Sequence, residues 1–314
     1  MLTIALATLL ALQEDVEKQA ARVTEKDSRA SFDALSRLAD LAGPSRAAVE
    51  KGAGTMPAFY REALLEELRM QERMGDKCPK LKRLSLDIRN QAPLAVFTDL
   101  NTQHGDKLQL SFLNPRMGGQ AGANLTLRAG DVTFMEALDA VCRESKSSLM
   151  MNGWRYGINP HQPNVASFAY RNVIVQVGSA SRQRKVEFGA GETRSYQLSL
   201  QIFWDIDAPL LQVVKGRVTE ALDSAGGTVA VLPPPVAAPE AEPARNDASL
   251  ASLYPMSFST QEVQLAVPKG DTIRVRGWYD VLVAGESSLF EFAPVGADAK
   301  KADERYALEV GKKN

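Results

Sequence analysis

The spacing of apolar residues divides the chain into a helical first part and a strand-rich second part. From 15 to 74 the apolar residues recur every three or four positions, which is the period of an amphipathic helix. The pattern predicts a helix that Ser28 could cap and that Gly43-Pro44 ends, a short helix around 47–51, and a last helix over 58–74. That last helix carries on its inward face Tyr60, Leu64 and Leu68.

Residues 84–152 mix the helical period with the strand period. Apolar and polar residues alternate, as in half-buried strands, around 84–88, 108–112, 125–128 and 148–151. One helix is predicted from Pro93 to Gly105, with its inward face made of Leu94, Phe97 and Leu100. A second helix begins at a capping box formed by Thr133 and Glu136. The order β-α-β-β-α-β predicts a small sheet with both helices on one face.

From 166 onward the pattern is almost purely that of strands. Alternation is clearest from Tyr196 to Trp204, and its phase places Trp204 in a core. Further strand patterns lie at 173–177, 218–221, 228–232, 257–267, 273–283 and 289–292. This spacing favours an antiparallel β-sandwich of immunoglobulin-like or jelly-roll type.

These patterns predict an α+β multidomain protein with segments of different character. We expect a helical segment at 14–76, a small βαββαβ domain at 80–153 and a β-sandwich at 165–294. A Pro-rich, low-complexity insertion at 233–252 interrupts the sandwich. A charged tail at 295–314 follows, with one more short strand predicted at 306–310.

Two stretches resemble known families. The sequences Leu-Ser-Leu-Asp-Ile-Arg-Asn-Gln-Ala-Pro-Leu at 84–94 and Asn-Leu-Thr-Leu-Arg-Ala-Gly-Asp-Val-Thr-Phe-Met-Glu-Ala-Leu-Asp-Ala-Val at 124–141 resemble the short N-terminal (STN-like) domain of secretins and TonB-dependent receptors. The resemblance implies docking of partner proteins in the bacterial periplasm. Nothing downstream resembles the rest of a secretin or of such a receptor, so channel and receptor functions are not implied. The segment 14–76 is similar to HEAT-type repeats, with an ordinary helical subdomain as the alternative.

The first residues form an uncharged apolar run from Leu2 to Leu12. Such a run is typical of a secretory signal peptide, whose apolar core spans about 7–15 residues. We therefore expect a signal peptide at 1–13, a periplasmic or secreted protein, and no stable membrane insertion after cleavage. The run lacks a preceding Lys or Arg and a small-x-small cleavage site. The alternatives are the buried first helix of a cytosolic domain and an uncleaved anchor.

Composition narrows the classes of function. The 37 Lys and Arg nearly balance the 38 Asp and Glu, so no bulk basic field favours a nucleic-acid partner. Two His, two Cys and no known catalytic motif argue against an enzyme, and we predict no cofactor and no metal site. We expect instead an unknown protein partner.

A few residue pairs could in principle carry chemistry. Cys142 and His104 could act as a nucleophile and a base. However, Cys142 lies on the apolar side of a capped helix, where a cysteine usually serves as a small buried core residue. Asp205 and Asp207 could hold a cation but read as solvated strand-end charges. In an oxidising compartment Cys78 and Cys142 could form a disulfide.

Two further features are predicted to be loops. The glycines at 118–122 lack the lysine of a phosphate loop and precede a strand, so they form a connection between strands. His161 lies between two prolines and is expected in an exposed linker.

Aromatic residues support a second reading of function. Four aromatic residues could stack on a sugar or another small ligand on a face of the sandwich: Trp154, Trp204, Trp278 and Tyr279. Core packing is favoured for Trp204, and Trp278 is the more open case. The favoured hypothesis is an exported, non-enzymatic interaction or scaffold protein of the cell envelope that docks partners through its STN-like domain. The alternatives are a carbohydrate- or ligand-binding sandwich, and an enzyme that uses the carboxylates Asp205, Asp207 and Glu220.

Overall fold

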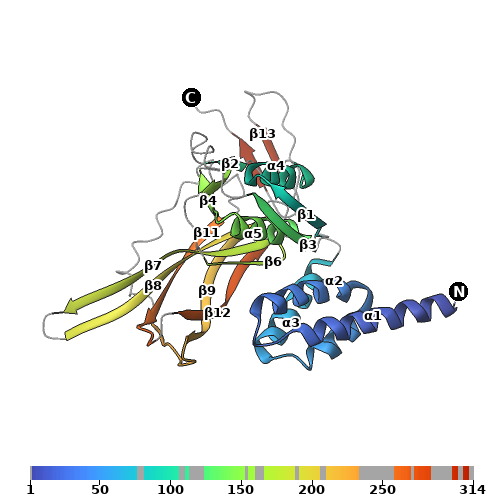
Figure 1. The fold of residues 1–314 in the computed structure, drawn as a ribbon, viewed down its shortest axis with the longest axis horizontal. Helices are drawn as coiled ribbons and strands as arrows, with labels where there is room; N and C mark the ends of the chain where they lie inside the picture. The colour runs from blue at the N-terminus through green and yellow to red at the C-terminus, as the bar shows by residue number, and fades with distance from the viewer. Residues whose placement is uncertain are drawn as a thin grey trace.

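The computed structural model combines helices with several antiparallel sheets (Figure 1). It describes residues 2–75, 81–105, 110–112, 124–152, 155–159, 166–187, 191–205, 210–232, 258–269, 272–283, 299–302 and 307–310. In Figure 1 the helical N-terminal part, in blue, lies against the small module and beside strands β9 and β12.

Three helices form the N-terminal part: α1 (Leu2–Arg22), α2 (Ser28–Ala53) and α3 (Ala58–Met74). The backbone of α2 is non-helical at Ser45, which confirms the interruption predicted at Gly43-Pro44. The cap of α2 is Asp27 and not Ser28, because the Asp27 carboxylate accepts a hydrogen bond from the Ala30 N–H at 3.0 Å. The predicted inward face of α3 is confirmed by the buried Tyr60, Leu64 and Leu68.

The apolar run at the start of the chain continues without a break into the polar helix that follows it, since α1 begins at Leu2. Val16 and Ala20 of α1 are buried in a core to which α2 and α3 also contribute. Among the described residues, no helix combines the length and the apolar character that a membrane span needs.

The small module contains β1 (Arg83–Gln91), α4 (Pro93–Gln103), β2 (Leu110–Phe112), β3 (Leu125–Thr133), α5 (Phe134–Glu144), β4 (Ser148–Asn152) and β5 (Arg155–Asn159). This order confirms the predicted β-α-β-β-α-β pattern and adds β5. The capping box at the start of α5 is also confirmed, with the Thr133 N–H donating to Glu136 Oε2 at 2.8 Å.

The prediction of one small sheet was wrong. β1 pairs antiparallel with β3, while β5 lies between β2 and β4 in a separate three-stranded sheet. The reason is the β4–β5 hairpin, because its second strand comes directly after β4 in sequence and occupies the place beside β2. The inward face of α4 also differs, since Leu94 is 55% exposed and Val96 is buried in its place.

The second half of the chain forms two antiparallel sheets. The larger contains β6 (Ser167–Tyr170), β7 (Val173–Glu187), β8 (Gly191–Trp204), β10 (Val231–Leu232) and β11 (Phe258–Ala266), in the order β10-β11-β8-β7-β6. The smaller pairs β9 (Leu210–Asp223) with β12 (Ile273–Val283). In the predicted tail, β13 (Ala299–Ala302) and β14 (Ala307–Val310) form a hairpin, so the strand expected near 306–310 is confirmed.

The five-stranded sheet is buried on both faces near its centre. On one face Ile174 and Phe203 join the core of the small module, together with residues of α5. On the other face Ile202 and Trp204 pack against Val213 of β9. This alternation confirms the core position predicted for Trp204, and it makes the small module and the sheet share one hydrophobic core.

Candidate functional site

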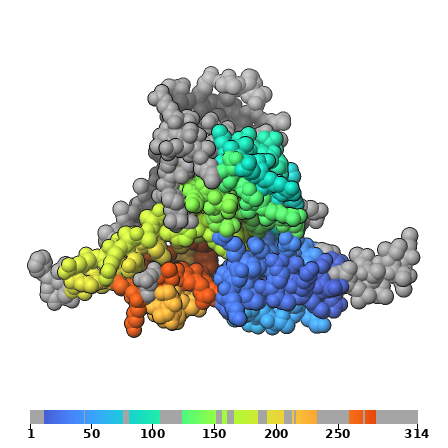
Figure 2. Space-filling view, viewed as in Figure 1, coloured from blue at the N-terminus to red at the C-terminus, as the bar shows by residue number. Residues whose placement is uncertain are grey.

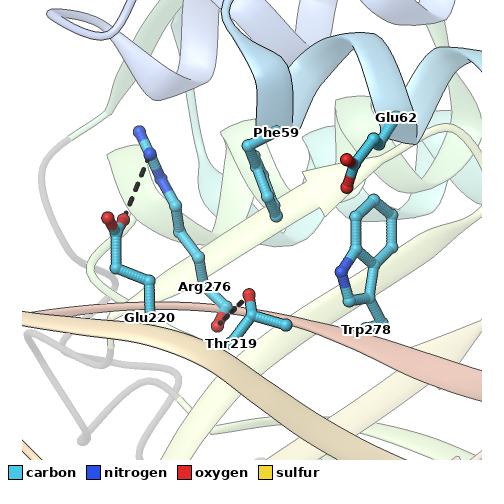
Figure 3. A pocket seen from close by; sticks show the side chains of 6 residues that line it. All are labelled: Phe59, Glu62, Thr219, Glu220, Arg276 and Trp278. Carbon is cyan, nitrogen blue, oxygen red and sulfur yellow. Dashed lines mark hydrogen bonds and ion pairs between the residues drawn. The ribbon is translucent and has the colours of Figure 1, made fainter.

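A cleft lies where α3 faces the outer side of the β9–β12 pair (Figure 3). Its volume is about 200 Å³, and it is lined by Phe59, Glu62, Thr219, Glu220, Arg276 and Trp278. Figure 3 shows Phe59 and Glu62 pointing from the helix toward the strands, and Trp278 rising from β12 to meet them. The rings of Phe59 and Trp278 are 5.2 Å apart with an interplanar angle of 43°.

The strand geometry separates the two aromatic residues predicted to stack on a ligand. Neighbouring residues of a strand point to opposite faces, so Trp278 faces the cleft and Tyr279 faces the interior. Tyr279 packs against the cluster of Ile202, Trp204 and Val213. Burial there raises the pKa of Tyr279 to about 12. Trp278 and Tyr279 therefore do not form one stacking platform, and of these two residues only Trp278 lines the cleft.

Arg276 is held tightly at one side of the cleft. Its guanidinium donates to Glu220 Oε2 at 3.2 Å and to the carboxylate of Glu25. The same group lies over the rings of Phe59 and Tyr60, 5.2 and 5.4 Å from their centroids. Burial opposes the charge, but the hydrogen bond to Glu25 and the nearby acidic groups hold the pKa of Arg276 above its ordinary value. Arg276 therefore links α3 to β9 and is committed to internal partners.

The enzyme alternative assigned a shared role to three carboxylates, and the structure gives two of them different partners. Glu220 binds Arg276 beside the cleft, whereas the carboxylate of Asp205 lies 3.1 Å from Nε2 of the buried His104 ring. His104 also stacks on Phe134 with ring centroids 3.9 Å apart. Asp207 lies outside the described residues.

Cys142 is a free thiol buried in the core of the small module. Burial raises the pKa of Cys142, which keeps the thiol neutral and unreactive. The imidazole of His104 pairs with the carboxylate of Asp205, so the structure does not assign His104 to Cys142 as a base. Cys78, considered as a disulfide partner, lies outside the described residues, and so do Trp154, His161 and the glycines at 118–122.

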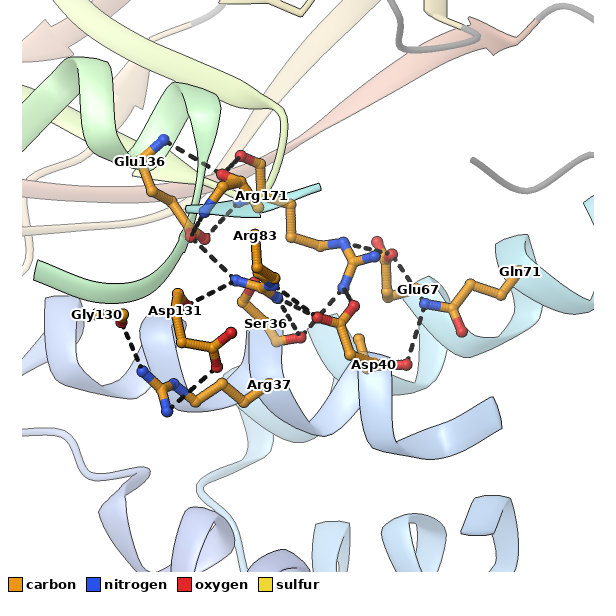
Figure 4. A network of polar contacts seen from close by, with 12 residues as sticks. Ser36, Arg37, Asp40, Glu67, Gln71, Arg83, Gly130, Asp131, Glu136 and Arg171 are labelled. Atoms are coloured by element: carbon orange, nitrogen blue, oxygen red, sulfur yellow. Dashed lines mark hydrogen bonds and ion pairs between the residues drawn. The ribbon is translucent and has the colours of Figure 1, made fainter. Parts of the chain in front are cut away.

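A network of ion pairs joins the helical part to the small module (Figure 4). At its centre, the buried guanidinium of Arg171 contacts Asp40 at 2.8 Å and Glu67 at 3.1 Å. The Arg171 N–H donates to Glu136 Oε1 at 3.0 Å, so the capping box of α5 takes part in the same network. Arg83 joins it through Asp40 and through Glu136 at 3.2 Å. These contacts are internal and stabilise the arrangement of the parts.

Within the described residues, no group of three or more His, Cys, Asp or Glu side chains could hold a metal ion.

The paired strands β7 and β8 extend beyond the rest of the sheet as a two-stranded arm, which we define as residues 179–187 and 191–194 (Figures 1 and 2). β6 pairs with β7 only as far as Gln176, and β11 pairs with β8 only as far as Ser195. Within the described residues the arm strands pair only with each other, and residues 179–184 and 192–194 are exposed.

The chain matches no protein-family model, no curated protein and no solved structure. The function must therefore be inferred from the surfaces of this molecule.

The sequence pattern revealed only part of the cleft. Trp278 stood out as an aromatic residue on a strand, but Phe59, Glu62 and Arg276 did not. Phe59 and Glu62 do not belong to the predicted inward face of the helix, which is made of Tyr60, Leu64 and Leu68. The alternation of Arg274, Arg276 and Trp278 along one strand face was the available signal.

Proposed function

We propose that this protein is an exported interaction protein of the bacterial cell envelope that docks partner proteins and carries out no reaction of its own. In this proposal the chain consists of a helical segment at 14–76, an STN-like docking domain at 80–153 and a β-sandwich at 165–294. The resemblance at 84–94 and 124–141 supports the docking role, and the apolar run at 1–13 supports export.

The observation that carries the proposal is the two-stranded arm. A two-stranded ribbon is marginal by itself in water, and each of its outer edges presents unpaired N–H and C=O groups. An added strand from a partner would satisfy these groups, which is the β-augmentation mode of recognition. Residues 179–194 contain four basic and two acidic residues, so an acidic partner strand fits the arm best.

The small module supplies a second surface for the same role. Among the described residues, β1 and β3 pair only with each other, so each has an edge without a neighbouring strand. Leu94 lies exposed just after the end of β1. An exposed apolar side chain beside an open strand edge suits contact with a partner segment.

Site-specific photo-crosslinking tests the role of the arm. A photoreactive residue at Arg184, in the full chain produced in its native cells, should give a discrete adduct with a partner protein. The matched control is the same residue at Arg69, which is also exposed and basic but lies on α3. Equal labelling from both positions, or no adduct from Arg184, would count against the arm. Fractionation that finds the full chain wholly in the cytosol would remove the envelope assignment.

The carbohydrate- or ligand-binding alternative is favoured by one observation, the position of Trp278 in the cleft. The cleft is smaller than the about 300–1,000 Å³ of typical pockets for drug-sized ligands. It suits a single side chain or one small ring better than an oligosaccharide.

A further inference from the structure

The charged groups of the cleft between α3 and β9–β12 differ in their partners. Glu62 points into the cleft toward Trp278 (Figure 3), and within the described residues no ion pair or hydrogen bond holds its carboxylate. Glu220, the other acidic group, is neutralised by Arg276 at 3.2 Å. Glu62 is therefore the charge that remains for a ligand.

Arg276 is the only cation among the six lining residues, and it is engaged by the protein itself. Two carboxylates and two aromatic rings surround its guanidinium. An anionic ligand would have to compete with Glu25 and Glu220 for this group and would meet Glu62 nearby. The cleft is therefore unfavourable for a phosphate, a carboxylate or an acidic peptide.

The half-buried Trp278 indole supplies the second element of recognition. A cation placed over an indole face is attracted by the negative potential of the ring, and a carboxylate close by strengthens that attraction. The Phe59 ring stands 5.2 Å from the indole and forms a second apolar wall. An aromatic wall with a free carboxylate beside it is a suitable environment for an ammonium or guanidinium group with an apolar stem.

We infer that this cleft binds a lysine or arginine side chain of a partner protein, with the cationic head between Glu62 and Trp278 and the aliphatic stem against Phe59. The cavity of about 200 Å³ has room for a single side chain. The inference rests on the proposed interaction function, because the cation comes from a partner protein. It concerns a different surface from the arm and is tested without the partner.

The test is a titration of the full chain followed by NMR of the indole N–H signals. The protein has three Trp, and the Trp278→Phe variant identifies the signal of Trp278. The probes are N-acetyl-argininamide and N-acetyl-lysinamide, with N-acetyl-norleucinamide as a neutral probe that keeps the apolar stem. N-acetylglucosamine represents the sugar alternative. Both cationic probes should shift the Trp278 signal saturably, while norleucinamide and the sugar should not.

Substitution of the free carboxylate gives the decisive comparison. Glu62→Gln should weaken binding of the cationic probes by up to about fivefold, the size of one exposed ion pair. Glu66→Gln is the matched control, one helical turn away and paired with Arg69, and it should leave the affinity unchanged. Equal binding of norleucinamide, saturable binding of the sugar alone, no shift with any probe, or no effect of Glu62→Gln would overturn the inference. Crosslinking through the arm is independent of these outcomes, so failure of the cleft and failure of the proposed function are distinguishable.

Discussion

Arg171 shows how much of this structure depends on a single side chain. It is 6% exposed, it adopts a positive φ of 52°, and its backbone and guanidinium contact different parts of the molecule. Although burial opposes the charge, the carboxylates of Glu67 and Asp40 hold its pKa above the ordinary value. A buried charge in such a position is stabilised by its partners and becomes costly when one of them is removed.

Tyr279 provides a prediction about pH. Burial raises its pKa from 10.0 to about 12, so the unfolded chain loses the phenolic proton before the folded chain does. The stability contributed by the neutral phenol is complete below pH 10.0 and is lost as the pH rises toward about 12. Tyr279→Phe should therefore flatten the alkaline decline of the free energy of unfolding, measured by urea denaturation across this window. Measurements at neutral pH set the baseline, and parallel declines in both proteins would contradict the prediction.

At the scale of elements, β9 and β12 approach each other closely at a bulge. The pairing shifts register between Arg276 and Gly277, next to the residues that face the cleft. A Cβ atom on Gly277 would lie 2.2 Å from the backbone oxygen of Arg217. Only glycine allows this approach, and the bulge helps to set the direction of Arg276 and Trp278.

Gly277→Ala should lower the free energy of unfolding by about 1–3 kcal/mol, because the strands must move apart to admit the methyl group. Gly130→Ala is the matched control, since a Cβ atom on this strand glycine would have no neighbour within 4 Å. We expect the control to be neutral or to stabilise by up to about 1 kcal/mol. Chemical denaturation measures both, and equal effects would show that crowding at the bulge is not the cause.

At the scale of the whole molecule, the parts are joined by different kinds of contact. The small module and the five-stranded sheet share a hydrophobic core, which includes Ile174 and Phe203. The helical part meets them through aromatic rings and ion pairs. The ring centroids of Phe32 and Phe168 are 4.6 Å apart, and Arg171 pairs with the carboxylates of Asp40 and Glu67. The helical interface is therefore more polar and depends on complete pairing.

Arg171→Met should destabilise this interface by about 3–5 kcal/mol, because the largely buried carboxylate of Glu67 loses its partner while the apolar stem is kept. Arg37→Met removes a half-exposed arginine from the edge of the same interface, where Arg37 lies 3.5 Å from Asp131, and should cost less than about 1 kcal/mol. Hydrogen exchange would measure the opening of α1–α3 in each variant. Similar protection in the two variants would argue against a central role for Arg171.

Elements whose causes are local could be predicted from the amino-acid sequence alone. The helix face at Tyr60, Leu64 and Leu68, the capping box at Thr133 and Glu136, and the alternation up to Trp204 all depend on neighbours within a few residues. These features were predicted and are confirmed, because helix period, capping and strand alternation are properties of short segments. The export and STN-like assignments remain predictions.

Strand pairing and the contacts between faces depend on how distant segments of the chain pack together. The separation of β1–β3 from β2–β5–β4 depends on competition between strands distant in sequence, as does the burial of Val96 in place of Leu94. The cleft brings Phe59 and Glu62 together with Arg276 and Trp278, more than 200 residues later in the chain. Such a site is created when two elements pack, so no local pattern in either element could predict it.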